Sequence, residues 1–147
     1  MRVAIANDHV ALGLKAAIKA YLDSRAIDYV DFGADTRERT DYPIYADKVA
    51  RLVASGEFDR AILFCGTGVG MSIAANKVPG IRAVVCSEPY TAVMSRCHND
   101  TNILCLGARV VNSGLAVMIV DQWLAAEFEG GRHQARLEMM NRLINEG

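Results

Sequence analysis

The fold is decided by one stretch of the chain, Ala61-Ile62-Leu63-Phe64-Cys65-Gly66-Thr67-Gly68-Val69-Gly70-Met71-Ser72. Its first four residues form an apolar run typical of a buried strand. Cys65 ends that run and opens a glycine-rich turn, and a helix-compatible segment follows over residues 72–77. A strand, a glycine-rich turn and a helix in this order point backbone N–H groups at one spot. Their positive field favours a thiolate near neutral pH, so Cys65 is a candidate nucleophile or base beside an anion cradle.

The rest of the chain alternates between short apolar runs and segments with helical spacing. Strands are predicted over residues 3–6, 29–32, 61–64, 82–86 and 103–106. Helices are predicted over residues 14–22, 42–53, 72–77, 88–97 and 115–123, and in an amphipathic segment after Gly130-Gly131. This alternation predicts βαβ units and an α/β fold, with a five-stranded, mostly parallel sheet that has helices on both faces. No linker divides the chain, so residues 1–147 are expected to form a single domain.

Composition limits the classes of function. The chain has 147 residues, 52% of them hydrophobic, and a formal net charge of -1, so no basic excess favours a nucleic-acid partner. No apolar run is long enough for a membrane span, and the first residues turn polar too early for a signal peptide. The four cysteines lack zinc-site spacing and are expected to be reduced thiols in a cytoplasmic protein.

Polar residues follow three of the predicted strands. Asp8 and His9 follow the first strand, Cys65 and the glycines follow the third, and Ser87 follows the fourth. Because ligands of such sheets bind beyond the carboxyl ends of the strands, these residues are expected to share one edge. The glycine turn lacks the Gly-x-Gly-x-x-Gly spacing of dinucleotide sites, the Gly-Lys-Ser/Thr of Walker loops, and the phosphatase arginine at the position of Met71.

Other candidate residues have structural interpretations as well. His9 after Asp8 is also explained as part of a helix cap, and His98 as part of a helix end and turn. Arg132, His133 and Arg136 lie on one side of the last helix, where a solvated basic face is the usual explanation. An anion cradle without arginines is unusual, however, and these arginines are the obvious candidates to complete it.

Taken together, the motifs resemble a known family. They are Asp8-His9, Tyr42-Pro43, Cys65 to Gly70, His98-Asn99-Asp100 and Gly130-Gly131-Arg132-His133. In order and spacing, over nearly the whole chain, they resemble the ribose-5-phosphate isomerase B family, which includes the galactose-6-phosphate isomerase of the lactose pathway. The resemblance implies a Rossmann-like α/β/α sandwich that acts on a sugar phosphate without a cofactor or metal. It also implies a homodimer, possible pairing of dimers, and a terminal helix that reaches to the partner.

The resemblance also implies roles for individual residues. Cys65 matches the base that moves a proton between C1 and C2 of the open-chain sugar, and His98 matches the acid that helps to open the ring. The remaining matches are substrate contacts: Asp8, His9, Tyr42, Gly66, Thr67, Gly68, Val69, Gly70, Asn99, Arg109, Arg132 and Arg136. The glycine-turn amides match the group that holds the developing oxyanion, and the arginines match phosphate ligands.

Two departures bear on the substrate. Asn7 and Ala11 stand where many members of the family have a small residue and a glycine, close to the expected position of the sugar hydroxyls. Retention of Cys65 and His98 favours ribose 5-phosphate over allose 6-phosphate or galactose 6-phosphate, which remain alternatives. A non-catalytic nucleotide- or flavin-binding module also remains. A metal-dependent isomerase using His9, His98 and His133 is disfavoured, because these histidines lack the paired spacing of a metal-binding helix.

Overall fold

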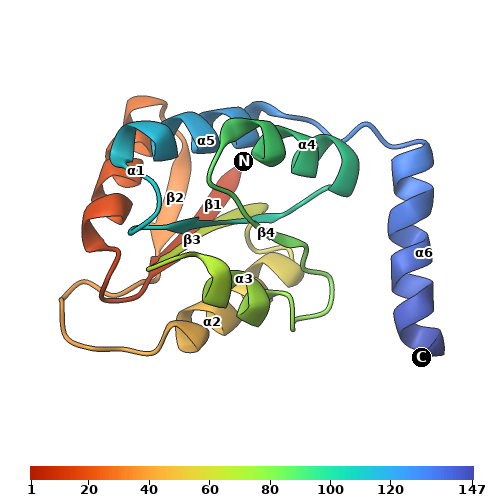
Figure 1. The fold of residues 1–147 in the computed structure, drawn as a ribbon, viewed down its shortest axis with the longest axis horizontal. Coiled ribbons are helices and arrows are strands. Elements are labelled where there is room, and N and C mark those ends of the chain that lie inside the picture. Colours follow the sequence, from red (N-terminus) through yellow and green to blue (C-terminus); the bar gives the residue numbers. More distant parts are fainter.

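The computed structural model describes residues 1–147 and contains one five-stranded sheet (Figure 1). The strands are β1 (Arg2–Asn7), β2 (Asp28–Asp31), β3 (Arg60–Cys65), β4 (Ala83–Val85) and β5 (Ile103–Gly107). Their order across the sheet is β2-β1-β3-β5-β4, and every neighbouring pair is parallel. The predicted α/β fold is therefore confirmed.

Helices cover both faces of the sheet, as the apolar strands require. They are α1 (Leu12–Ser24), α2 (Tyr42–Ala54), α3 (Val69–Ala75), α4 (Pro89–Asn99), α5 (Ser113–Ala125) and α6 (Arg132–Glu146). Figure 1 shows α1, α4 and α5 on one face and α2 and α3 on the other. Residues of β3 alternate between the two cores: Ile62 and Phe64 pack with α1 and α5, and Leu63 and Cys65 pack with α2 and α3. The three-layer prediction is confirmed.

Two helix boundaries differ from the prediction in ways that matter for the site. Helix α3 begins at Val69 rather than Ser72, so the end of the glycine turn is already helical. Helix α4 continues through His98 and Asn99, which the sequence placed in a polar loop. It ends there because Asp100 takes a left-handed conformation, with φ of 47°. The Asp100 carboxylate accepts a hydrogen bond from Arg96 at 2.8 Å, which fixes the end of this helix.

The C-terminal helix stands apart from the three layers (Figure 1). Helix α6 packs against α4 through the buried side chains of His133 and Leu137. The rest of its apolar stripe is open: Met140 is 50% exposed, Leu143 55% and Ile144 82%. No helix of the structure has the length and apolar character needed to cross a bilayer.

Candidate active site

The carboxyl end of β3 brings Cys65 to the start of the glycine turn. The residue is buried, and its Sγ accepts a hydrogen bond from the backbone N–H of Gly68 at 3.2 Å. The thiol of Cys65 is therefore held against the main chain of the glycine turn.

Close packing explains two of the three glycines in the turn. Gly68 has φ of +81°, and a Cβ there would lie 3.0 Å from the carbonyl carbon of Leu106. A Cβ on Gly70 would lie 2.5 Å from the ring of Tyr42, the first residue of α2. The missing side chains let the turn lie against β5 and under the Tyr42 ring.

Several amide groups of the turn are free to bind a ligand. The N–H of Val69 donates to the hydroxyl of Thr67, and that of Gly68 donates to Cys65. The N–H groups of Gly66, Thr67, Gly70 and Met71 have no acceptor in the protein. Unpaired amides beside a thiol can hold an oxyanion.

Asp8 and His9 lie just beyond the end of β1, beside β3. The Asp8 N–H donates to the carbonyl of Phe64 at 3.2 Å, and its carboxylate accepts from the N–H of Val10 at 3.0 Å. The buried side chain of Asn7 donates to the Asp8 carbonyl at 2.8 Å. His9 accepts the N–H of Thr40 at its Nδ1 at 3.2 Å, which fixes the ring on the loop before α2.

Arg109 lies in the turn that follows β5, at the same edge of the sheet. Its backbone N–H donates to the carbonyl of Gly66 at 3.0 Å, and the neighbouring Ala108 N–H donates to the backbone carbonyl of Cys65 at 2.8 Å. A cavity of about 390 Å³ is lined by Asp8, Tyr42, Cys65, Gly66, Thr67, Val69, Gly70, Ile73 and Arg109. Of these, only Ile73 was missed, although its spacing of one helical turn from Val69 could have indicated it.

The other predicted residues form a second group, where α4 meets α6. The rings of His98 and His133 stack at 4.2 Å between centroids with planes 10° apart. Glu129 Oε1 lies 3.4 Å from Nε2 of His133 and 3.8 Å from Nε2 of His98. Burial, followed by the nearby His98 and Arg132, lowers the pKa of His133 below its usual value. Asn99, Arg132 and Arg136 are exposed around this pair.

This histidine pair is poorly arranged for a metal. The potential ligand atoms of His98, Glu129 and His133 all lie within 4.8 Å of one another. Imidazole binds a metal along a direction in the plane of its ring, and two stacked, nearly parallel rings point their nitrogens side by side rather than at one point. In these rotamers the two histidines cannot both bind one ion with good geometry.

The two groups of predicted residues do not meet within one chain. Cys65 pairs in register with Gly107, at the carboxyl end of the sheet. Helix α4 leaves β4 at that same end and runs back, so that His98 lies near the amino end of β5, before Ile103. His98 therefore lies away from the edge that Asp8, Cys65 and the glycines share, because a crossover helix runs antiparallel to the parallel strands that it connects.

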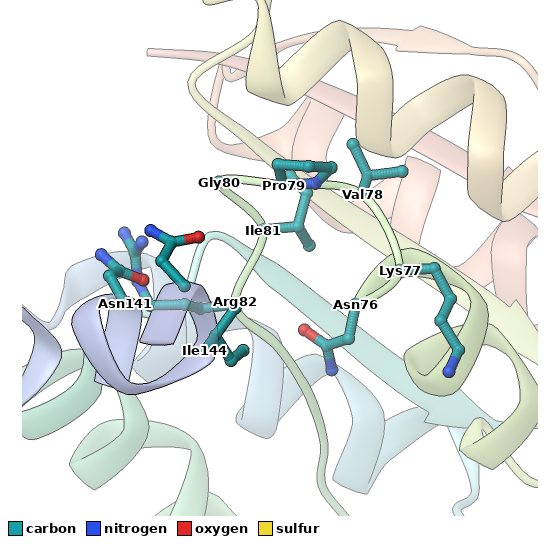
Figure 2. A pocket seen from close by; sticks show the side chains of 10 residues that line it. Asn76, Lys77, Val78, Pro79, Gly80, Ile81, Arg82, Asn141 and Ile144 are labelled. Carbon is teal, nitrogen blue, oxygen red and sulfur yellow. The ribbon is translucent and has the colours of Figure 1, made fainter. Parts of the chain in front are cut away.

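Two of the other thiols, Cys86 and Cys105, and the largest cavity lie outside both groups. Burial raises the pKa of Cys86 to about 11 and that of Cys105 well above its usual range, so both stay protonated. The largest cavity, about 560 Å³, contains none of the predicted site residues. Figure 2 shows Asn141 and Ile144 of α6 on one side of it and Pro79 and Ile81 on the other.

The fold and this strand-end site define a Rossmann-like α/β protein with a thiol and free amides facing one cavity. Comparison with known proteins identifies the family within that class. The profile described as Ribose/Galactose Isomerase matches residues 3–140, and the chain belongs to this family. It is 60% identical over 137 residues to ribose-5-phosphate isomerase B of Escherichia coli K12, covering 93% of this chain and 92% of the relative.

Solved structures agree with this assignment. Ribose-5-phosphate isomerase B of Clostridium thermocellum matches with a TM-score of 0.96 and 52% identity, covering 99% of both chains. The Mycoplasma genitalium enzyme, solved with bound ribulose 5-phosphate, matches with a TM-score of 0.93 and 40% identity, covering 99% of this chain and 97% of that one.

Proposed function

We propose that this chain interconverts ribose 5-phosphate and ribulose 5-phosphate, as a single catalytic domain over residues 1–147 that works in the cytoplasm without a cofactor. The observation that carries the proposal is the pairing of Cys65 with the free amides of the glycine turn. An aldose-ketose shift is redox-neutral and needs a base at the α-carbon and donors for an enediolate. Cys65 is the proposed base, and the free amides of the turn at the end of β3 are the proposed donors.

In the proposed reaction, the Cys65 thiolate removes the proton from C2 of the open-chain aldose. The electron pair of the broken C–H bond forms the C1–C2 double bond of an enediolate, and negative charge develops on O1. The free N–H groups of Gly66, Thr67 and Gly70, which line the cavity at Cys65, are the proposed donors for that charge. Return of the abstracted proton from Cys65 to C1, with transfer of the O2 proton to O1, gives the ketose.

Ring opening needs an acid at the ring oxygen, and phosphate binding needs cations. His98 is the proposed acid, and Arg109, Arg132 and Arg136 are the proposed phosphate ligands. Asp8, His9, Tyr42 and Asn99 are proposed to contact the sugar. Because His98 and Arg132 lie away from Cys65 in one chain, a complete site requires these groups from a second copy.

A homodimer therefore forms part of the proposal. The exposed apolar side chains of α6, Met140, Leu143 and Ile144, supply a surface that burial against a second copy would remove from water. In a two-fold dimer, each site would combine Cys65 of one protomer with His98 of the partner subunit. Pairing of two dimers into a tetramer is compatible with this arrangement.

The test is a comparison of kcat/KM for ribose 5-phosphate, allose 6-phosphate and galactose 6-phosphate with the purified protein after exhaustive chelation. We expect the pentose phosphate to be preferred and the activity to survive chelation. Preference for a hexose phosphate would move the assignment to the six-carbon alternative. Absence of turnover on all three, together with tight binding of AMP or a flavin, would support the non-catalytic module.

A further inference from the structure

A second cavity adjoins the one at Cys65. It measures about 400 Å³ and is lined by His9, Val10, Leu12, Gly13, Arg37 and Arg109. Arg109 lines both cavities, so they meet at its side chain. A sugar phosphate whose C1 and C2 atoms lie at Cys65 can therefore extend past Arg109, so that its phosphate lies toward His9 and Arg37.

The charge of this second cavity is strongly one-sided. Arg37 and Arg109 form no ion pair within the chain, and no carboxylate is among the lining residues. The acidic neighbours of Arg37 in sequence, Asp35 and Glu38, line a separate cavity together with Arg39. The loop thus directs Arg37 alone toward the cavity beside the candidate active site.

His9 adds a neutral donor to the same cavity. Its Nδ1 accepts the N–H of Thr40, so this nitrogen carries no proton and the Nε2 atom carries the ring N–H. A ring held in this tautomer donates a hydrogen bond from Nε2. The cavity consequently offers two guanidinium groups and one imidazole N–H, all of which are donors.

The loop that carries Arg37 is attached to the fold on both sides. The carbonyl of Ala34 accepts a hydrogen bond from the buried ammonium of Lys15, which also forms an ion pair with Asp31 at 3.0 Å. On the other side of Arg37, the Thr40 hydroxyl and the Tyr45 hydroxyl are 2.9 Å apart. Anchors on both sides reduce the conformational entropy that is lost when the loop orders around a ligand.

We propose that Arg37 is a further substrate-binding residue, whose guanidinium binds the phosphate group of the sugar together with His9 and Arg109. This inference rests on the proposed isomerase function and deepens it. An arginine can bind two phosphate oxygens at once, so Arg37 adds affinity for phosphorylated sugars and contributes nothing to unphosphorylated ones. Arg37 thereby strengthens selection for the phosphate group at the end of the site farthest from Cys65.

The matched variants are Arg37→Ala and Arg39→Ala, because each removes one positive charge from the same loop and only Arg37 lines this cavity. Binding of inorganic phosphate is measured by titration calorimetry at fixed ionic strength. We expect the Kd to rise about tenfold in Arg37→Ala, the scale of one charge-assisted contact at a partly exposed site. In Arg39→Ala it should stay within about twofold of wild type, the scale of a screened charge without a contact. Arg37→Lys should restore part of the affinity.

Kinetics give a second readout of the same variants. Arg37→Ala should raise the KM for ribose 5-phosphate with little change in kcat, because the contact is made equally in the ground state and the transition state. An unchanged phosphate Kd in Arg37→Ala, or an equal loss in both alanine variants, would overturn the proposal. Phosphate binding is measured without turnover, so failure of the isomerase assignment remains distinguishable from failure of the Arg37 contact.

Discussion

Cys65 and His98 lie at opposite ends of the same parallel sheet. Cys65 is level with Gly107 at the carboxyl end, whereas His98 lies in the last turn of α4, which has run back toward the amino end of β5. A single sugar cannot contact both side chains of one chain. If both act on the same substrate, they come from different protomers.

Replacing Cys65 with alanine should remove isomerisation and leave the fold intact. The expected loss in kcat is about 10²- to 10⁴-fold, the usual contribution of a positioned acid-base group. Cys86→Ala is the matched control, because its thiol is also buried at the end of a strand and faces the other core. Rates on ribose 5-phosphate, with circular dichroism for folding, provide the measurement. Turnover close to wild type in Cys65→Ala would refute the assignment of the base.

The contact between Gly70 and Tyr42 should be sensitive to one added methyl group. In Gly70→Ala the new Cβ meets the Tyr42 ring at 2.5 Å, so the ring or the turn must move. We expect a loss in kcat/KM of about 10- to 100-fold, since small displacements of a site are costly. Gly114→Ala is the control, because its nearest neighbour is at 3.6 Å.

A double variant identifies the cause of that loss. When Tyr42→Ala is present, Gly70→Ala should destabilise the protein much less than it does alone, because the ring that it meets is gone. Thermal unfolding of the two single variants and the double variant gives the coupling. Equal destabilisation by Gly70→Ala in both backgrounds would show that the ring contact is not the cause.

His98→Asn should impair the cyclic substrate more than an open-chain aldehyde analogue. Ring opening is the step that His98 is proposed to assist, and an acyclic sugar avoids it. The measurement is the ratio of kcat/KM for the two substrates in wild type and variant. The same loss on both substrates would mean that His98 acts in another step or only in structure.

The lowered pKa of His133 predicts a stability that depends on pH. Folding holds this imidazole neutral by burial and by the nearby His98, Arg132 and Arg136, against the opposite effect of Glu129. The unfolded chain therefore binds the proton more tightly, and stability should fall as pH decreases through the ordinary histidine range near about 6.5. His133→Gln should flatten this dependence. Thermal unfolding between pH 8 and pH 5, about the span over which histidine titrates, gives the measurement. An unchanged slope in the variant would contradict the prediction.

The sequence predicts most of the fold, since short apolar runs alternate with segments of helical spacing and leave few other topologies. It places Asp8, Cys65 and the glycines correctly on one edge, because strand ends obey a simple rule. It makes no prediction of the end of the sheet at which His98 lies, because that position depends on α4 running antiparallel to the strands. The early start of α3 was also missed, because Gly68 and Gly70 are poor helix formers whose conformations are set by Leu106 and Tyr42. No motif or spacing marks Arg37 as a candidate binding residue, because it is one of several charged residues in an exposed loop.

The shared site can be tested most directly with mixed dimers. An inactive Cys65→Ala chain and an inactive Arg132→Ala chain carry different tags and are dissociated, mixed in equal amounts and allowed to reassemble. Each heterodimer then has one site with both lesions and one with neither. Random reassembly should restore about a quarter of the wild-type activity per chain, since half of the dimers are mixed and each of these has one intact site. Verified heterodimers without activity would contradict the shared site and place both residues in the same protomer's site.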